Sequence, residues 1–173
     1  LHQTYGGDTM QYTCSYSSPL GEILIASDGS AVTGLWFIGQ KYFGSTLEAE
    51  YAEKALPVFG QTVRWLDDYF QGNVPMEMPP VSFNSSSFRI RVWKLLMEIP
   101  YGHTVTYGEI ARILEKQTGR RICAQAVGGA VGHNPVSIIV PCHRVIGSNG
   151  LTGYAGGLDK KLALLRLEGV NVH

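Results

Sequence analysis

The sequence predicts an α+β fold in which a small N-terminal domain of sheet and helix precedes a mainly helical C-terminal domain. Two observations lead to this prediction: β-rich segments cluster in residues 11–38, and helical periodicity dominates residues 88–131. A chain of 173 residues is long enough for two small domains with a core each. Residues 1–9 are a candidate leader or cloning remnant, with Met10 as the natural start.

The N-terminal domain, expected over residues 10–72, should begin with a β-meander. Strands are predicted at residues 11–16 and 22–26, because apolar and polar residues alternate there, and at residues 31–38, which are rich in β-forming residues. The turns between them have the sequences Ser-Pro-Leu-Gly and Ser-Asp-Gly-Ser. Consecutive strands with such short connections are typical of an antiparallel sheet.

Residues 46–71 have a helical pattern that Pro57 should divide in two. The first predicted helix covers residues 46–56. The second is longer and amphipathic, and it should end at Gly72.

Residues 73–87 contain three prolines and a run of three serines, a composition typical of a linker. The C-terminal domain should then cover residues 88–173. Its first helix is expected to begin near Phe88 and to end before Pro100, with the serines in place to cap its start.

A helix-turn-helix is predicted next. Thr106 and Glu109 match the capping-box pattern, which indicates a helix over residues 107–116, and Gly119 should end it. A second helical stretch follows over residues 120–131. Two short helices joined by a tight, glycine-containing turn are typical of this motif.

The second of these helices is unusual because Gly128 and Gly129 each cost about 1 kcal/mol in helix propensity. Tight packing against another helix would explain them. Close approach to a nucleic-acid groove would explain them too, and the neighbouring Arg120 and Arg121 favour this second interpretation. The residues alone leave both open.

The neutral total charge hides an uneven distribution. The chain has 14 Lys and Arg against 14 Asp and Glu. Residues 1–87 carry three basic and nine acidic side chains, whereas residues 88–173 carry eleven basic and five acidic ones, so the two halves have net charges of −6 and +6. Such asymmetry points to a polyanionic partner for the C-terminal half.

Composition also bears on the compartment. No apolar run approaches the ~18 residues that span a bilayer, and no signal-peptide pattern is present, so we expect a cytoplasmic (intracellular) protein without a membrane partner. Cys14, Cys123 and Cys142 are widely spaced and fit reduced thiols better than a disulfide framework. No C-x-x-C pair is found, so no metal site is expected.

The residues that could carry chemistry follow a predicted buried strand over 136–140. Pro141 ends the strand, and Cys142, His143 and Arg144 come next. A thiol is nucleophilic only as thiolate, and a nearby imidazole and guanidinium lower its pKa, although an inert buried thiol is the alternative. Adjacent residues of an extended chain point to opposite sides, so His143 would need a bridging water or a turn at Pro141 to take the thiol proton.

A catalytic histidine also needs a partner that orients it, commonly a carboxylate. Glu168 is the candidate, at the end of a last helix predicted over residues 159–168. Its spacing is equally consistent with a solvated charge at a helix end.

The motifs around Cys142 closely resemble those of the O6-alkylguanine-DNA alkyltransferases, also called methylated-DNA–protein-cysteine methyltransferases. The matching segments are Ala-Val-Gly-Gly-Ala-Val-Gly-His-Asn-Pro, Ile-Val-Pro-Cys-His-Arg-Val-Ile, Gly-Tyr-Ala-Gly-Gly-Leu and Leu-Glu-Gly. The resemblance covers residues 88–173 and, more weakly, residues 10–72. It implies a ribonuclease-H-like N-terminal domain and a winged-helix-like helix-turn-helix in the C-terminal domain.

The resemblance also implies direct-reversal DNA repair. Members bind double-stranded DNA in the minor groove, flip the damaged guanine out of the stack and move its O6-alkyl group irreversibly onto their own cysteine. The expected protein is therefore a single-turnover, monomeric suicide methyltransferase that needs no cofactor. Its expected substrate is DNA with O6-alkylguanine, with O4-methylthymine as a candidate second substrate.

By match of motif, Cys142 would be the alkyl acceptor, His143 the base that acts through a water, and Glu168 the residue that orients this histidine. Asn134 would brace the active-site turn. Tyr107 would help to rotate the phosphate and would protonate the departing guanine, for which a phenol is a suitable donor.

Substrate contacts follow from the same match. The carbonyls of Cys142 and Val145 would accept from the guanine amino group, and the Ala155 N–H would hold O6. Tyr154 and Gly156 belong to the same loop, whose glycines allow close approach to the base. The residues expected to contact DNA are Gln125, Arg121, Ala126, Gly129, Arg144 and Ser148.

Gln125 departs from the family pattern, which commonly has arginine at this position. Glutamine can fill the gap left by the flipped base but brings no charge, so we expect weaker DNA binding with the chemistry intact. Some relatives bind zinc in the N-terminal domain, and Cys14 alone does not provide such a site.

Three other functions compete with alkyl transfer as explanations of these motifs. A non-catalytic lesion-binding relative would lack the acceptor cysteine, which is present here as Cys142. A Cys-His hydrolase is disfavoured because Cys142 and His143 are adjacent. A transcription regulator would leave the Pro-Cys-His-Arg segment unexplained.

Overall fold

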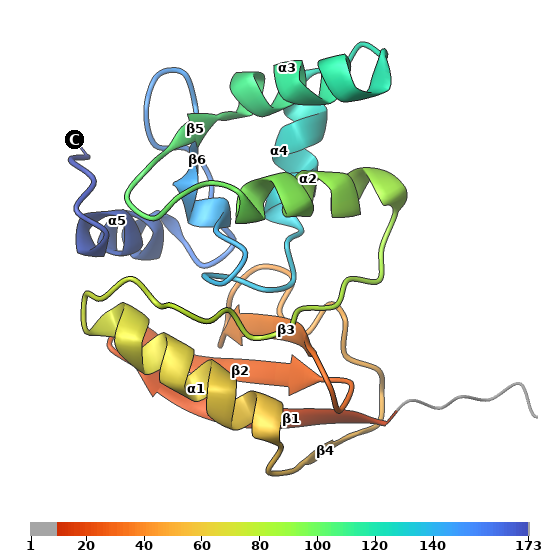
Figure 1. Cartoon of the computed structure of the whole chain (residues 1–173), viewed down its shortest axis with the longest axis vertical. Coiled ribbons are helices and arrows are strands. Elements are labelled where there is room, and N and C mark those ends of the chain that lie inside the picture. Colours follow the sequence, from red (N-terminus) through yellow and green to blue (C-terminus); the bar gives the residue numbers. More distant parts are fainter. Residues whose placement is uncertain (1–9, 173) are drawn as a thin grey trace, which may run out of the picture.

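The computed structural model describes residues 10–172, so the prediction about residues 1–9 lies outside the described part (Figure 1). The chain folds into two layered halves: a sheet with one helix below, and a group of helices above. Among the described residues, no helix has the length and apolar character that a membrane crossing requires.

The N-terminal half contains a four-stranded sheet. Strands β1 (Gln11–Ser18), β2 (Gly21–Ser27) and β3 (Val32–Phe37) form the predicted antiparallel meander, and β4 (Tyr51–Glu53) pairs with β1 in parallel. The order across the sheet is β3-β2-β1-β4. The predicted second helix is also confirmed: α1 (Pro57–Phe70) begins at its proline and lies across one face of the sheet (Figure 1).

The predicted helix over residues 46–56 is wrong. Apart from β4, this stretch is irregular. It is held to the sheet by polar contacts: the Thr46 hydroxyl donates to the Thr33 carbonyl over 3.0 Å, and the Gln11 amide donates to the Thr46 carbonyl over 2.8 Å. Its side chains are mostly exposed, so the segment has no apolar stripe with which a helix could pack.

The C-terminal half consists of α2 (Ser87–Met97), β5 (Val105–Thr106), α3 (Tyr107–Thr118), α4 (Ala124–Gly132), the 3-10 turn η1 (Cys142–Arg144), β6 (Val145–Ile146) and α5 (Leu158–Leu167). Helix α3 has the predicted capping box, in which the Thr106 hydroxyl and the Glu109 carboxylate bond each other's backbone N–H groups. It ends at Gly119, whose φ of 68° suits glycine. Helix α4 begins at Ala124, later than predicted.

The predicted buried strand over residues 136–140 is also wrong, although every residue in it is buried. Ile138 has a φ of 70°, and local hydrogen bonds such as Val140 N–H to the Val136 carbonyl (3.1 Å) fold the segment into turns. Periodicity cannot distinguish a buried strand from a buried turn of similar composition.

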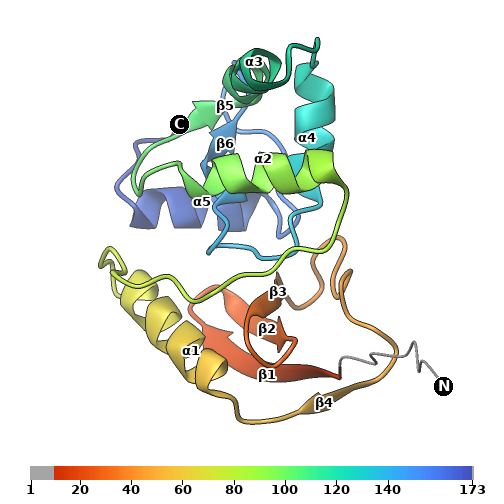
Figure 2. The same ribbon diagram turned by 45° about the vertical axis from the view of Figure 1, so that its right-hand side comes forward.

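The two halves share one hydrophobic core. The outer edge of β3 bonds both to the connecting segment and to the C-terminal half: Val32 N–H donates to the Pro80 carbonyl (2.7 Å), and Leu35 N–H donates to the Pro135 carbonyl (2.8 Å). Figure 2 shows the connecting segment passing between the sheet layer and the helical layer. This contact places the turn before Cys142 directly against the N-terminal sheet.

Candidate active site

Cys142 lies at the bottom of a cavity of about 360 Å³ between the helix-turn-helix and the loop before α5. Its side chain is buried, and η1 begins at this residue, directly after Pro141. The cavity is lined by Lys41, Tyr42, Tyr107, Gly128, Gly129, Val131, Gly132, His133, Cys142, Gly153, Tyr154 and Ala155.

The side of the cavity that α4 forms is lined mainly by glycines, whose lack of side chains leaves it open. A Cβ atom built at Gly129 or Gly132 would meet nothing within 4 Å, and one at Gly128 would be in ordinary contact with the Tyr107 ring at 3.9 Å. Packing within the described structure therefore does not require these glycines. They leave the side of the cavity open instead, which a bulkier helix would narrow.

Residues of the N-terminal half complete the opposite rim, which sequence analysis missed. The Tyr42 ring stacks on the His133 ring with centroids 4.0 Å apart, and the Lys41 N–H donates to the Ala155 carbonyl over 3.0 Å. Both come from the turn after β3, whose sequence gave no signal for a site. The contact depends on how the two halves pack, and periodicity carries no such information.

His143 points away from the cavity toward the end of α5. Its Nε2 atom lies 2.5 Å from Oε2 of Glu168, and both side chains are fully buried. The structure thus brings together the pair that sequence analysis named. Glu168 follows α5 directly and is fixed there because its own N–H donates to the Leu164 carbonyl.

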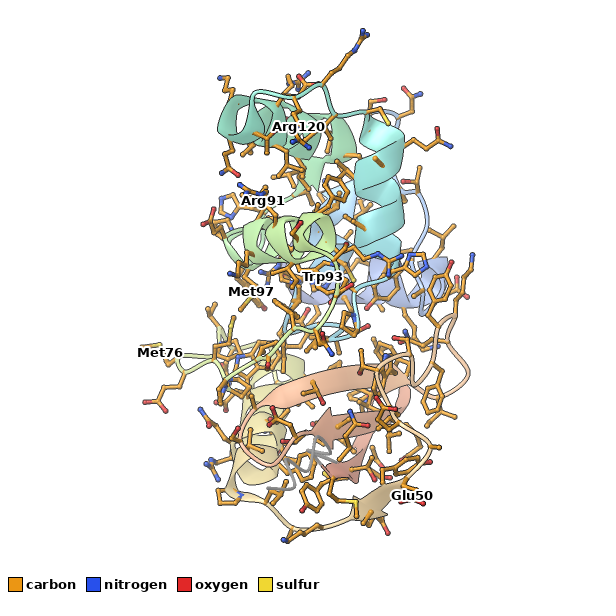
Figure 3. The ribbon with its side chains drawn as sticks, turned by 90° about the vertical axis from the view of Figure 1, so that its right-hand side faces the viewer. Glu50, Met76, Arg91, Trp93, Met97 and Arg120 are labelled. Atoms are coloured by element: carbon orange, nitrogen blue, oxygen red, sulfur yellow. The ribbon has the colours of Figure 1, made fainter. Side chains whose placement is uncertain are left out.

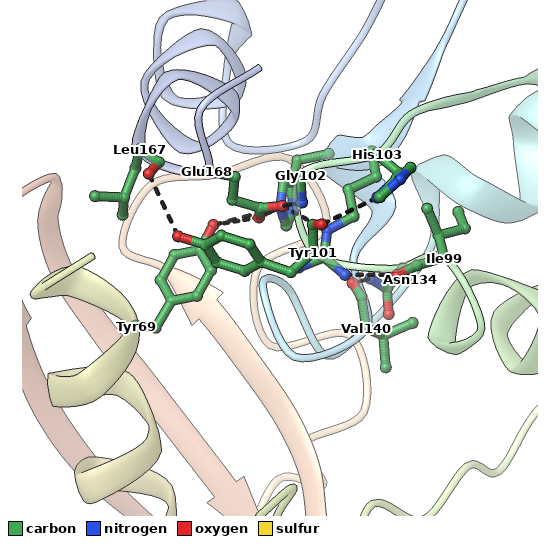
Figure 4. A network of polar contacts seen from close by, with 11 residues as sticks. Tyr69, Ile99, Tyr101, Gly102, His103, Asn134, Val140, Leu167 and Glu168 are labelled. Atoms are coloured by element: carbon green, nitrogen blue, oxygen red, sulfur yellow. Dashed lines mark hydrogen bonds and ion pairs between the residues drawn. The ribbon is translucent and has the colours of Figure 1, made fainter. Parts of the chain in front are cut away.

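The Glu168 carboxylate accepts four hydrogen bonds, two on each oxygen. Oε2 accepts from His143 and from the Tyr69 hydroxyl (2.6 Å), and Oε1 accepts from Nε of Arg144 (2.8 Å) and from the Gly102 N–H (2.9 Å). The donors come from α1, η1 and the loop after α2, as Figure 4 shows around the labelled Tyr69, Gly102 and Glu168. A buried carboxylate this well satisfied is a rigid anchor.

Electrostatics fix the protonation states of this pair. Burial would raise the pKa of Glu168, but the hydrogen bond and charge of His143, with Arg144 and the Gly102 N–H, lower it to about 2. Burial lowers the pKa of His143 below its ordinary value, although Glu168 acts in the opposite direction. A neutral histidine beside a carboxylate keeps its proton on Nε2, which leaves Nδ1 as an acceptor. Among the described residues, Nδ1 has no hydrogen-bond partner.

The resting form of Cys142 follows from its surroundings. Burial raises the pKa of its thiol, while a hydrogen bond from Asn134 and the charge of Lys161 act in the opposite direction. The thiol therefore needs a base before it can react. Asn134 also braces the preceding turn: its Nδ2 donates to the Val140 carbonyl (2.8 Å), and its Oδ1 accepts from the Val136 N–H (3.0 Å).

Lys161 is a second residue that sequence analysis missed. Its buried ammonium donates to the carbonyls of Val145 (2.5 Å), Thr152 (2.7 Å) and Gly153 (3.1 Å), which ties the loop after β6 to α5. Burial lowers the pKa of this ammonium to about 8, although the charge on Cys142 acts in the opposite direction. The Val145 carbonyl, expected to face guanine, thus already has one donor and retains its second lone pair.

The other expected site residues divide between cavity and surface. Tyr107, Tyr154 and Ala155 line the cavity, whereas Gly156 does not. Residues at the surface of α4, near its start and in the turn after β6 are Arg121, Gln125, Ala126, Gly129 and Ser148.

The expectation that Arg144 contacts DNA is wrong, because its side chain is buried. Its guanidinium donates to Glu168 and to the Ile99 carbonyl. The same group lies 5.8 Å from the centroid of the Tyr101 ring. Among the described residues, no group of three or more His, Cys, Asp or Glu side chains is placed to hold a metal ion.

Comparison with known proteins gives two family matches. Residues 87–170 match the domain described as "6-O-methylguanine DNA methyltransferase, DNA binding domain", and residues 11–79 match the "6-O-methylguanine DNA methyltransferase, ribonuclease-like domain". The chain is 45% identical over 152 residues to a methylated-DNA–protein-cysteine methyltransferase of Mycobacterium bovis, with 87% of this chain and 88% of the relative covered. It is 43% identical over 163 residues to one of Methanosarcina acetivorans, which covers 91% of this chain and 98% of that relative.

Solved structures agree with these matches. The crystal structure of Mycobacterium tuberculosis O6-methylguanine methyltransferase superposes with a TM-score of 0.78 at 41% identity and covers 92% of this chain and 93% of that one. A Mycobacterium tuberculosis OGT in complex with DNA gives a TM-score of 0.77 at 41% identity, covering 92% of each chain.

Proposed function

The chain belongs to the O6-methylguanine DNA methyltransferase family, and from this premise we propose that Cys142 receives the alkyl group. The activity of the chain is that of a methylated-DNA–protein-cysteine methyltransferase: it transfers the alkyl group of O6-methylguanine in DNA to a protein cysteine and so repairs the DNA. One observation carries the choice of cysteine. Cys142 lines a cavity with Tyr107, and the His143–Glu168 pair lies directly behind it.

The proton of the thiol leaves through His143. Because Nε2 holds its proton against Glu168, the unpartnered Nδ1 accepts the Cys142 proton through a bridging water. The thiolate then attacks the O6-alkyl carbon, so that the S–C bond forms and the C–O6 bond breaks. The charge that develops on His143 is stabilised by the Glu168 carboxylate.

Tyr107 protonates the departing guanine. Burial raises the pKa of this phenol, so it keeps its proton until a base as strong as the guanine anion develops beside it. The proton that leaves Cys142 replaces the one that Tyr107 gives up, and the balance is a methylated thioether and an unmodified guanine. The thioether is not displaced, so each chain reacts once.

The flipped base enters between α4 and the loop that carries Tyr154 and Ala155. The glycine-lined wall at Gly129 supports this path, since open space there serves no internal packing. Helix α4 would lie in the minor groove of double-stranded DNA, where its small residues permit close approach and Gln125 fills the gap left by the base. A single chain supplies every group named here, which fits a monomer, and a DNA substrate fits an intracellular site of action.

An intact-mass measurement tests the assignment. The protein is incubated with a duplex that contains O6-methylguanine, and we expect one added CH₂ per chain, located on the peptide of Cys142. Cys142→Ser should acquire no adduct, whereas Cys123→Ser, which alters an exposed thiol, should react like the unchanged protein. An adduct on Cys14 or Cys123, or none at all, would overturn the proposal.

A further inference from the structure

The N-terminal half contributes one side chain to the buried network behind Cys142. Tyr69, on α1, donates its hydroxyl to Oε2 of Glu168 over 2.6 Å and lies 3.4 Å from Nε2 of His143. Figure 4 shows the ring extending from α1 toward the C-terminal half. We propose that Tyr69 is a positioning residue of the alkyl-transfer site, whose hydroxyl holds the Glu168 carboxylate in the orientation that aligns His143. This inference rests on the role proposed for His143.

The ring of Tyr69 is held so tightly that its hydroxyl has one direction. The side chain is fully buried. It stacks on Trp65 with centroids 5.4 Å apart and an interplanar angle of 6°, and its edge meets Phe70 and Tyr101. Such packing is preserved when only the hydroxyl is removed, so phenylalanine at this position isolates the hydrogen bond.

The hydroxyl has a defined effect on the carboxylate. Glu168 has two donors on each oxygen, and without Tyr69 its Oε2 atom would have His143 alone. The other two donors, the Gly102 N–H and Nε of Arg144, bond to Oε1. The negative charge of Oε2 would then act more strongly on the imidazole, and the carboxylate would lose one of the contacts that fix its rotation.

The charges around His143 determine the direction of the pH effect. Glu168 favours the imidazolium, whereas the cations of Arg144 and Lys161 and the burial of the ring disfavour it. Tyr69 contacts the ring from α1, and Cys142 precedes it on η1. Removal of the Tyr69 hydroxyl strengthens only the attraction between the Glu168 carboxylate and the imidazole. It therefore favours the imidazolium form of His143. His143 must be neutral to accept a proton. The acidic limb in the pH profile of the alkyl-transfer rate should therefore move to higher pH.

The main test compares Tyr69→Phe with the unchanged full chain. We expect the acidic limb of the single-turnover rate to move up by about 0.5 to 1 pH unit, and the imidazole of His143, followed by NMR, to titrate at a correspondingly higher pH. Tyr16→Phe is the matched control, because the Tyr16 hydroxyl donates to Asp67 over the same 2.6 Å in an exposed pair outside the Glu168 network. Its profile and titration should equal those of the unchanged chain.

Replacement of Tyr69 by 3-fluorotyrosine keeps the ring and makes its hydroxyl a stronger hydrogen-bond donor to Glu168. The acidic limb of the rate profile should then move to lower pH. Profiles of both Tyr69 variants that superpose on that of the unchanged chain would overturn the inference, as would an equal shift in Tyr16→Phe. If the unchanged chain formed no Cys142 adduct, the proposed function would fail, and the NMR titration would still decide whether Tyr69 acts on His143.

Discussion

Nε of Arg144 lies 2.8 Å from Oε1 of Glu168, and this ion pair is enclosed between the loop after α2 and the end of α5. The arginine that follows the Cys142–His143 pair therefore belongs to the interior and not to the DNA surface. Its second contact, to the Ile99 carbonyl, uses another nitrogen of the same planar guanidinium, a geometry that lysine cannot reproduce.

Arg144→Met should destabilise the fold by about 3–5 kcal/mol, because the buried Glu168 carboxylate loses its cation. Urea unfolding followed by fluorescence measures the change. Arg121→Met, which removes an exposed arginine near the start of α4, should alter stability by less than about 0.5 kcal/mol and should instead weaken DNA binding. Equal destabilisation by the two variants would contradict the interior role of Arg144.

Acid should destabilise the protein through Glu168. The pKa of this carboxyl is lowered from 4.5 to about 2 in the folded state, so its stabilisation is present above pH 4.5 and is lost as the pH falls toward 2. The difference between the two pKa values corresponds to about 3 kcal/mol. The free energy of unfolding of Glu168→Gln should be lower at neutral pH and flatter over this window, whereas Glu77→Gln, at an exposed site, should follow the unchanged chain. Parallel curves for the unchanged chain and Glu168→Gln would exclude this contribution.

The contrast between Glu168 and Tyr69 shows what the sequence could and could not predict. The meander, α1, α3 and α5 follow from periodicity, capping and proline positions, and the Cys-His-Arg motif indicated the residues proposed as nucleophile and base. Tyr69 and Lys161 carried no such signal, because a tyrosine on an apolar helix face and a lysine on a terminal helix are ordinary in sequence. The role of Tyr69 arises only because the two halves share one core, which brings it to Glu168 across 99 residues of chain. The role of Lys161 arises within the C-terminal half, where the loop after β6 folds back over its ammonium.

Lys161→Met should loosen the loop after β6, because three carbonyls lose their common donor. We expect limited proteolysis within residues 147–157 to accelerate about tenfold and the alkyl-transfer rate to fall. Lys160→Met is the neighbouring control: this ammonium lies over the Phe37 ring at 5.4 Å and has no part in the loop network. A loop that resists protease equally in both variants would show that Lys161 does not hold it.

Gln125→Arg should tighten DNA binding without changing the rate of alkyl transfer within the complex. One added positive charge in the complex should make the slope of log K against log salt more negative, by at most about 0.9. Gln71→Arg adds the same charge at an exposed position after α1 and should leave binding nearly unchanged. If the two variants bound equally, total charge and not the position on α4 would determine affinity.

Tyr42→Ala should widen the cavity on the side of the N-terminal half. Loss of the ring stacked on His133 should favour a benzyl group over a methyl group at O6 by about tenfold in relative rate. Phe43→Ala removes the adjacent ring, which packs against Trp36 outside the cavity, and should not alter this ratio. Competition between the two modified duplexes, read by intact mass, measures it.

The opposite charges of the two halves make the molecule an electric dipole along its longest axis. In Figure 3, the labelled Arg120 lies beside α3 in the helical half and Glu50 lies near β4 in the sheet half. In the field of a polyanionic duplex such a dipole experiences a torque, which should turn the basic C-terminal half toward DNA before any contact forms. Because the net charge of the protein is zero, its nonspecific attraction to undamaged DNA should be weak. The dipole should still orient the protein as it approaches the duplex.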